Sequence, residues 1–326
     1  LQPTATQLRW AIDPEFMRGM LETPIREVYQ AQISEVRLSH IEYNGLDHVI
    51  HYDFTGQRRN RSWRQSLIAL ARRFSESSPP RAFPPLSLLQ DVWQSLHENP
   101  KAFLLPRPVA RLSPLAMMFF EEATPGTPIA SLLNGPQSLE VASLLGEAMA
   151  ALNQAPIDSA QLPASAGQAA SIRGQVDRFA EGHPNLASRA KDLLQEIESR
   201  TNELPVRVCP CLGWIPLRMI TRLEDRIALT QITGMQFANQ LMDIGELLCQ
   251  IALLAPGDKK IQQVVEQIRK SYLRATGGSE AELLAFEAAA FLRQATGPQN
   301  SSLPPEKLLD YSAERLLLAA STEAKS

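Results

Sequence analysis

The stretch from Val206 to Gly245 constrains the fold more than any other part of this chain of 326 residues. It starts as a short apolar strand, passes a loop rich in Pro and Cys, and continues as two strands joined by a tight turn at 223–225. A helix follows, opening near Asn239. A compact strand–turn–strand unit between long helical segments predicts a mixed protein rather than an all-helical one.

The clearest strand pattern lies in the N-terminal part, over Ile33 to Phe54. Apolar and aromatic residues alternate with polar ones in the second half of this stretch, which is the two-residue period of a strand. Asn44-Gly45 precedes the alternating run, and Asn-Gly between two strands is the favoured two-residue hairpin turn. The sequence therefore predicts a β-hairpin. His40 and His48 could face each other across it, and a buried or edge histidine pair is the commoner explanation for such an arrangement than a metal site.

Helices are also expected in the N-terminal part. Asp13, followed by proline, is a favourable N-cap and predicts a helix over about 13–27. The patterns of 63–74 and 86–97 predict two further helices, and a strand is expected over 115–121.

From Gly126 onward the pattern is almost entirely helical, with Gly and Pro punctuating the segments. Ser138 is expected to cap the first long helix. The fold class is therefore α+β, with a mainly β N-terminal lobe over 1–123 and a larger helical C-terminal lobe over 124–326. Later helices are predicted over 171–181, 186–203, 239–255, 259–275, 279–295 and 304–320.

Composition is that of an ordinary soluble globular protein, with 44% hydrophobic and 21% charged residues. The formal net charge of −3 argues against a strongly basic nucleic-acid surface. No apolar run approaches the roughly 18–20 residues that cross a bilayer. We therefore expect neither nucleic acid nor a membrane span. The chain begins at Leu1 rather than Met, which we interpret as a trimmed or partial chain.

The three cysteines, Cys209, Cys211 and Cys249, are too few for a disulfide framework in a chain of this size, which favours a cytoplasmic location. Cys209 and Cys211 form a Cys-x-Cys pair. A zinc site needs four ligands, and no further His or Cys lies near the pair in sequence. We therefore interpret the pair as small, half-buried residues at a strand end and expect no bound metal.

Several short motifs occur in the order and spacing of one known family. Pro106-Arg-Pro-Val109 precedes a strand that ends at Glu121-Glu122, and Thr124-Pro-Gly126 follows it. Leu145 to Asn153 has the form of a family helix that reads Leu-Gly-x-x-Leu-Ala-x-Leu-His. Together with the core at 206–245, these motifs resemble the aminoglycoside phosphotransferase and choline kinase-like family. The resemblance implies a two-lobed protein kinase-like fold, with Glu121, Glu122 and Gly126 as cleft or hinge residues.

The family core reads as a strand, His-Gly-Asp-x-His-x-x-Asn, a turn and a strand ending in Asp-Phe-Asp. Matched to this pattern, Cys211 stands at the catalytic Asp, whose carboxylate places the attacking hydroxyl. The Asn and Asp that hold Mg²⁺ correspond to Pro216 and Gln231, and the last Asp to Thr233. Asp243 matches the structural Asp that supports the catalytic loop, although an acid in the first turn of a helix is also favoured by the helix dipole alone. The resemblance therefore implies a degenerate member that lacks the catalytic motifs.

The N-terminal lobe lacks an obvious phosphate-binding lysine. Kinases of this kind place a Lys on an N-lobe strand, and Lys101 is the only lysine in the first half of the chain. One of the arginines could supply the charge instead, or these residues are ordinary surface cations. The arginines concerned are Arg37, Arg58, Arg59 and Arg61.

These observations predict a pseudokinase, a non-catalytic binding or scaffold protein with a protein partner or small metabolite as ligand and no cofactor. One alternative is an active small-molecule phosphotransferase with Mg-ATP as cofactor and relocated carboxylates, for instance Glu224 and Asp225. Another is a structural subunit of a larger assembly, which predicts an exposed apolar patch on the helical lobe.

Overall fold

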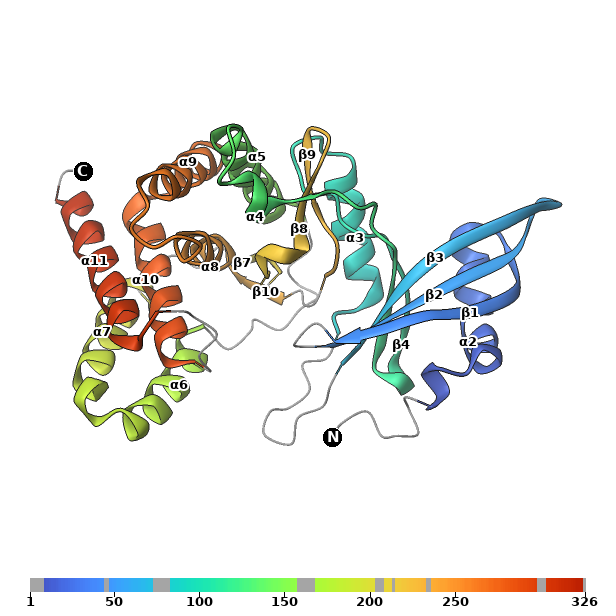
Figure 1. The fold of residues 1–326 in the computed structure, drawn as a ribbon, viewed down its shortest axis with the longest axis horizontal. Helices are drawn as coiled ribbons and strands as arrows, with labels where there is room; N and C mark the ends of the chain where they lie inside the picture. The colour runs from blue at the N-terminus through green and yellow to red at the C-terminus, as the bar shows by residue number, and fades with distance from the viewer. Residues whose placement is uncertain are drawn as a thin grey trace. The chain divides into compact units, whose positions relative to one another are not determined.

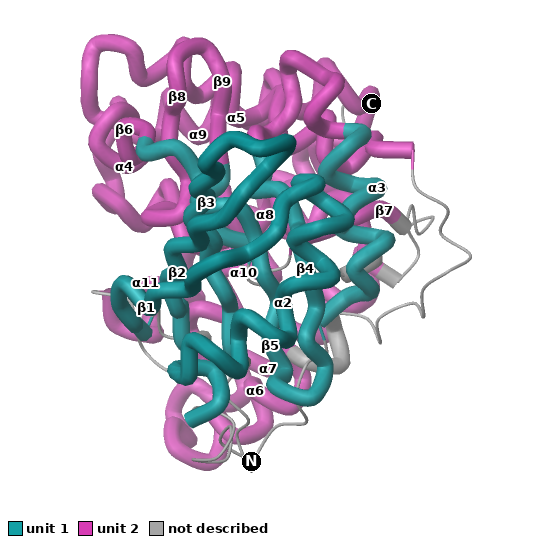
Figure 2. The backbone as a smooth tube through the Cα atoms, turned by 90° about the vertical axis from the view of Figure 1, so that its right-hand side faces the viewer, with its two compact units in different colours: residues 1–95, 105–125, 229–235 teal, residues 96–104, 126–228, 236–326 magenta. Residues whose placement is uncertain are grey.

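The computed structural model describes residues 9–43, 47–72, 83–156, 168–202, 208–212, 215–232, 236–297 and 303–324. They form an α+β protein (Figure 1), which confirms the predicted class. The chain divides into two compact units, shown in teal and magenta in Figure 2. Unit 1 comprises 1–95, 105–125 and 229–235, and unit 2 comprises 96–104, 126–228 and 236–326.

Unit 1 is built around a five-stranded antiparallel sheet with the order β1–β2–β3–β5–β4. Helix α2 packs against this sheet, and α3 follows β3 along the chain. The elements are α2 (Pro14–Tyr29), β1 (Gln32–Tyr43), β2 (Asp47–Arg58), β3 (Arg61–Arg72), α3 (Leu86–His97), β4 (Pro108–Leu112), the 3-10 turn η1 (Ser113–Leu115) and β5 (Met117–Glu121).

Helix α2 begins where the sequence predicts. The carboxylate of Asp13 accepts hydrogen bonds from the backbone N–H groups of Glu15 and Phe16, at 3.0 and 3.1 Å. This N-cap satisfies two of the backbone donors that a helix start leaves unpaired. The helix then buries one apolar face against the sheet, formed by Met17, Leu21, Ile25 and Tyr29.

The predicted hairpin is confirmed as β1 and β2, but its register differs from the expected one. His40 lies opposite His51, and a bulge between Leu38 and His40 shifts the pairing further from the turn. The two imidazole rings stack with centroids 3.7 Å apart. The prediction that His40 faces His48 is therefore wrong, because next to the turn the ladder already pairs His48 with Tyr43, which places His40 further along β2. Asn44-Gly45 lies outside the described residues.

The predicted helix over 63–74 is wrong, because residues 61–72 form the strand β3. Its apolar run from Leu67 to Ala71 is buried throughout, since β3 pairs with β2 on one side and β5 on the other. A central strand that is buried on both faces loses the alternation of a half-exposed strand, and periodicity does not separate it from a buried helix. Strand β4 was not predicted either; Pro108 is its first residue, where a missing N–H is tolerated.

Unit 2 is mainly helical and also holds two small sheets, the ribbon of β7 and β10 and the three-stranded sheet β6–β8–β9. The helices predicted from 171 onward are confirmed, with ends that differ by a few residues. The elements are β6 (Thr127–Pro128), α4 (Ile129–Leu132), α5 (Ser138–Asn153), α6 (Gln168–Gly182), α7 (Pro184–Asn202), β7 (Val208–Cys211), the 3-10 turn η3 (Leu217–Met219), β8 (Ile220–Leu223), β9 (Arg226–Leu229), β10 (Gln236–Asn239), α8 (Leu241–Ala252), α9 (Lys259–Thr276), α10 (Glu280–Thr296) and α11 (Pro305–Glu323).

One predicted cap differs. Gln137 is the N-cap of α5 and makes no side-chain capping bond, while Ser138 is the first helical residue and is buried. The position of a buried side chain is set by packing, which outweighs the capping preference of serine.

Helix α10 packs against α6, α7, α8 and α11, so it lies at the centre of the helical unit. Its contact with α8 requires Gly245, because a Cβ there would lie 2.8 Å from the carbonyl carbon of Phe286. No helix among the described residues has both the length and the apolar character needed to cross a membrane.

Candidate functional site

The ribbon of β7 and β10 brings Cys209 and Cys211 together on one face. Residues two apart on a strand point to the same side, and the two Sγ atoms lie 3.7 Å apart. Both thiols are free and buried, with exposed fractions of 6% for Cys209 and 0% for Cys211. The pair was predicted to be half-buried, and the structure buries it almost completely.

The surroundings of Cys211 favour a neutral thiol. Its Sγ donates to the backbone oxygen of Asn239 at 3.5 Å. The hydrogen bond with Cys209, burial and the negative charge of Asp243 together raise the pKa of Cys211 well above its ordinary value. The thiolate is the reactive form of cysteine, and these surroundings disfavour it at Cys211.

Asp243 joins the end of β7 to the start of α8. It lies in the first turn of α8 and is buried. Its Oδ2 accepts a hydrogen bond from the backbone N–H of Leu212, the residue after Cys211. A carboxylate in this position also interacts favourably with the positive end of the helix dipole. Asp243 therefore fixes the backbone that carries Cys211.

Two further buried side chains hold the same strand, and no local sequence pattern assigns either of them to the site. The hydroxyl of Tyr272, in α9, shares its single proton between Asn153 Oδ1 at 3.0 Å and the backbone oxygen of Gln240 at 3.1 Å. Asn153 of α5 donates in turn to Cys209 Sγ and to the Pro210 oxygen, each at 3.3 Å. We call Asn153, Cys209, Cys211 and Tyr272 the neutral cluster. Burial, followed by the nearby thiols and Asp243, raises the pKa of Tyr272 above its ordinary value.

The other residues matched to the family core lie in different surroundings. Pro216 is buried and immediately precedes the 3-10 turn η3. Gln231 is half-buried and belongs to the segment assigned to unit 1. Glu224 and Asp225 form the exposed turn between β8 and β9, with Glu224 at a φ of 55°. Thr233 lies outside the described residues.

The hinge candidates make contacts within their own units. Glu121 accepts the Tyr29 hydroxyl at 2.8 Å, and its carboxylate lies 3.8 Å from Arg107. Glu122 lies 3.2 Å from His51 Nδ1. Gly126 belongs to unit 2, where a Cβ would lie 2.6 Å from the Arg222 oxygen, so the close approach of the chain to β8 requires glycine here.

The candidate phosphate-binding cations are engaged with neighbouring residues or exposed. Lys101 pairs with Glu147 at 3.2 Å, and Arg37 pairs with Glu35 at 2.7 Å. Arg58, Arg59 and Arg61 lie at the exposed turn between β2 and β3. Within the described ranges, no group of three or more His, Cys, Asp or Glu side chains is arranged to hold a metal ion.

Comparison with solved structures identifies the fold. The choline kinase of Cryptosporidium parvum Iowa II superposes with a TM-score of 0.51 at 12% identity, covering 95% of each chain. A thermostable mutant of the aminoglycoside phosphotransferase APH(4)-Ia, in complex with ADP and hygromycin B, has a TM-score of 0.49 at 13% identity, covering 93% of this chain and 96% of that one. The macrolide 2'-phosphotransferase MphH from Brachybacterium faecium has a TM-score of 0.48 at 15% identity, covering 91% and 97%.

The chain therefore has the protein kinase-like fold of this choline kinase. No protein-family model matches the sequence. No curated protein matches it either.

Proposed function

We propose that this protein is a pseudokinase, a kinase-fold protein that does not transfer phosphate and acts by binding a protein partner or a small metabolite. The observation that carries the proposal is the state of Cys211, which stands where the family pattern has its catalytic Asp. A buried, neutral thiol does not orient a hydroxyl as a carboxylate does, and it is a poor ligand for Mg²⁺.

The other matched positions support the same proposal. Mg²⁺ prefers oxygen ligands in octahedral geometry, and the side chain of Pro216 offers no donor atom. Gln231 offers an amide in place of a carboxylate. The donor set of these positions therefore does not fit a magnesium nucleotide, while Asp243, the residue matched to a structural role, keeps a hydrogen bond to the Leu212 backbone.

An assay of Mg²⁺-dependent consumption of ATP and GTP by the purified chain tests this proposal. We expect no turnover above a protein-free blank. Turnover that disappears in the double variant Glu224→Gln/Asp225→Asn would instead establish a phosphotransferase with relocated carboxylates. Cys211→Ala is the matched control, since turnover that disappears in this variant would make Cys211 itself part of the chemistry.

A role as a subunit of an assembly is a second candidate, because Leu317 and Leu318 of α11 are adjacent and exposed, Leu317 at 72%. Exposed leucines beside one another are typical of interaction surfaces when they belong to a larger patch. Light scattering decides this point: a monodisperse monomer that is unchanged by Leu317→Ser would rule out self-assembly through α11.

A further inference from the structure

A pocket of about 260 Å³ lies in unit 2, where α9 and α11 approach the C-terminal end of α8. Most of its wall is apolar, with a few charged groups at one side. An apolar wall with a few polar groups is typical of pockets for small molecules, and the volume, just below their roughly 300 Å³ lower limit, restricts the ligand to a small one. The residues that the inference uses are Ala252, Phe291, Tyr311, Glu314, Arg315 and Leu318.

The pocket is separate from the neutral cluster. Asp243 lies in the first turn of α8, and Ala252 is the last residue of this helix. A rise of 1.5 Å per residue puts about 14 Å between them along the helix axis. A ligand in the pocket would therefore not touch the strand that carries Cys211.

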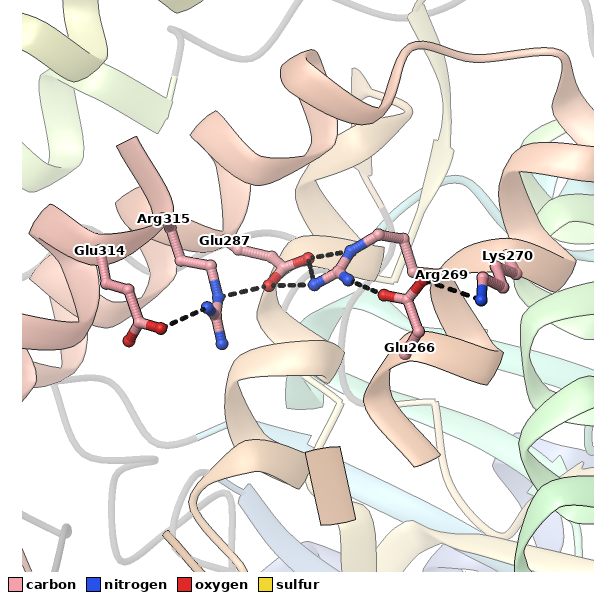
Figure 3. Close-up of polar contacts among 6 residues, drawn as sticks. All are labelled: Glu266, Arg269, Lys270, Glu287, Glu314 and Arg315. Carbon is pink, nitrogen blue, oxygen red and sulfur yellow. Dashed lines mark hydrogen bonds and ion pairs between the residues drawn. The ribbon is translucent and has the colours of Figure 1, made fainter. Parts of the chain in front are cut away.

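An ion network centred on the buried Glu287 (Figure 3) supplies the charged residues of the pocket wall, which are Glu266, Arg269, Glu314 and Arg315. Glu287 of α10, which is 1% exposed, lies between Arg269 of α9 and Arg315 of α11. It accepts from Arg269 Nε and Nη2 at 2.9 and 2.8 Å, and from Arg315 Nε at 3.0 Å. The Nη1 of Arg269 donates to Glu266. Carboxylates therefore occupy all three nitrogens of the Arg269 guanidinium.

Arg315 has hydrogen-bonding capacity left. Its Nη1 lies 3.7 Å from Glu314, which is longer than a hydrogen bond. Its Nη2 makes no hydrogen bond within the described part of the chain, and Figure 3 shows a terminal nitrogen directed away from both carboxylates. The side chain is only 14% exposed, and the guanidinium lies 5.8 Å from the centroid of the Phe291 ring. A partly desolvated guanidinium with a free edge is suited to bind a carboxylate with two parallel hydrogen bonds.

The charges around the pocket define what it accepts. Three carboxylates and three cations balance here, because Glu266, Glu287 and Glu314 lie among Arg269, Lys270 and Arg315. A dianion such as phosphate would lie beside two carboxylates of the pocket wall, Glu266 and Glu314, with only Arg315 offering unused N–H groups. Of the three carboxylates, only that of Glu314 lies beyond hydrogen-bond distance of its cation, and its side chain is 58% exposed. A bound cation would therefore gain little from it. A monoanion with an apolar body fits both the free edge of Arg315 and the apolar wall.

We propose that this pocket binds a small monocarboxylate with an aromatic or branched apolar body. Nη1 and Nη2 of Arg315 hold the carboxylate, and the apolar body lies against Phe291 and Leu318. The site is independent of the proposed function, since no residue of the neutral cluster lines it.

Ligand-observed NMR titration of the full chain tests this inference, with benzoate as the probe and benzamide as its neutral counterpart. We expect saturable binding of benzoate and about ten-fold weaker binding of benzamide, because the amide lacks the charge that Arg315 recognises. Equal binding of the two probes, or no binding of benzoate at millimolar concentration, would overturn the proposal.

Two variants locate the binding. Arg315→Lys keeps a positive charge beside Glu287 but removes the two-pronged edge, so benzoate binding should weaken about ten-fold. Ala252→Phe fills the pocket without changing the ion network, so benzoate binding should be lost. This variant tests the site independently of whether Arg315→Lys folds. Arg189→Lys, an exposed arginine of α7, is the matched control and should bind as the unaltered chain does. Unchanged benzoate binding in Ala252→Phe would contradict the site.

Discussion

Two buried polar clusters of unit 2 differ in their charge, although α9 contributes to both. The neutral cluster joins Tyr272 to Asn153 and the two thiols through hydrogen bonds of 3.0 to 3.3 Å. The ionic cluster, which we define as Arg269, Glu287 and Arg315, holds a buried carboxylate between two guanidinium groups. The first lies beside the N-terminal end of α8, and the second borders the pocket at its C-terminal end.

This difference in charge distinguishes groups that stabilise the fold from the charged groups that a phosphotransferase requires at its active site. Catalysis of phosphoryl transfer depends on charged groups around the phosphates and the metal. In this unit the buried charges of the ionic cluster connect three helices to one another. The strand matched to the catalytic core contains uncharged thiols instead. This distribution of charge agrees with the proposal that the protein is a pseudokinase, in which the fold serves binding rather than phosphoryl transfer.

The largest expected effect is that of Glu287→Gln. This change leaves two buried arginines opposite a neutral amide, and removing one partner from a buried ion pair costs about 3–5 kcal/mol of unfolding free energy. Chemical denaturation measures the loss. Glu314→Gln is the control, and because its carboxylate is mostly exposed the change should stay within about 0.5 kcal/mol. Equal effects of the two variants would show that the ionic cluster does not stabilise the unit.

Gly245→Ala should act on both clusters, because α8 connects them. The added Cβ would meet the Phe286 backbone at 2.8 Å and force α8 away from α10. Overpacking of this kind destabilises by about 1–3 kcal/mol. Gly19→Ala is the matched control: it lies inside α2 with no atom within 4 Å of the new Cβ, and should stabilise by about 0.5–1 kcal/mol. If Gly245→Ala left the unfolding free energy unchanged, α8 and α10 would not be held at this separation.

Tyr272→Phe tests the neutral cluster alone. Removing the hydroxyl leaves the acceptors of Asn153 and Gln240 without this donor, which should cost about 1–2 kcal/mol. Tyr311→Phe is the control, because the Tyr311 hydroxyl donates no hydrogen bond among the residues that the structure describes, and thermal unfolding compares the two. If both variants unfold at the same temperature, the hydrogen bonds of Tyr272 contribute nothing measurable.

The smallest effect at neutral pH is a loss of stability that appears only as the pH becomes alkaline. Cys211 lies in the neutral cluster, and Cys249 lies near the ionic one, where burial and the charge of Glu287 raise its pKa well above the ordinary value of 9.0. Above pH 9 the unfolded chain releases these thiol protons while the folded chain keeps them. Unfolding free energy should therefore fall with rising pH, by about 1.4 kcal/mol per pH unit for each thiol.

Cys211→Ala and Cys249→Ala should each make this decline shallower, which denaturation at pH 8 to 10 would measure against the unaltered chain. A slope that neither variant changes would mean that the thiols titrate at the same pH in the folded and the unfolded chain.

Much of the fold follows from local pattern. The N-cap at Asp13 and the apolar periods of the later helices are local signals, and the structure contains the elements that they predict. The pattern of β3 predicts a helix wrongly, since burial on both faces removes the signal that separates a strand from a helix. The bulge beside His40 has no distinct sequence pattern, so the register of the hairpin beyond it could not be predicted.

The candidate site is predictable only in part. Residue spacing along a strand is enough to bring Cys209 and Cys211 together. The bond between Tyr272 and Asn153 joins residues 119 positions apart, and no local pattern connects them. The same holds for Glu287 and Arg315, which lie on different helices 28 positions apart. Partners of this kind depend on how helices pack, which the sequence of each helix does not determine by itself.

The most direct measurement of the central claim is a calorimetric titration of Mg-ATP into the purified chain, with Mg-GTP and nucleotide-free Mg²⁺ as controls. The pseudokinase proposal, in which the positions of Cys211, Pro216 and Gln231 do not hold a magnesium nucleotide, predicts no detectable binding heat. Saturable, Mg²⁺-dependent binding of ATP would contradict it and would place the metal on residues other than these three.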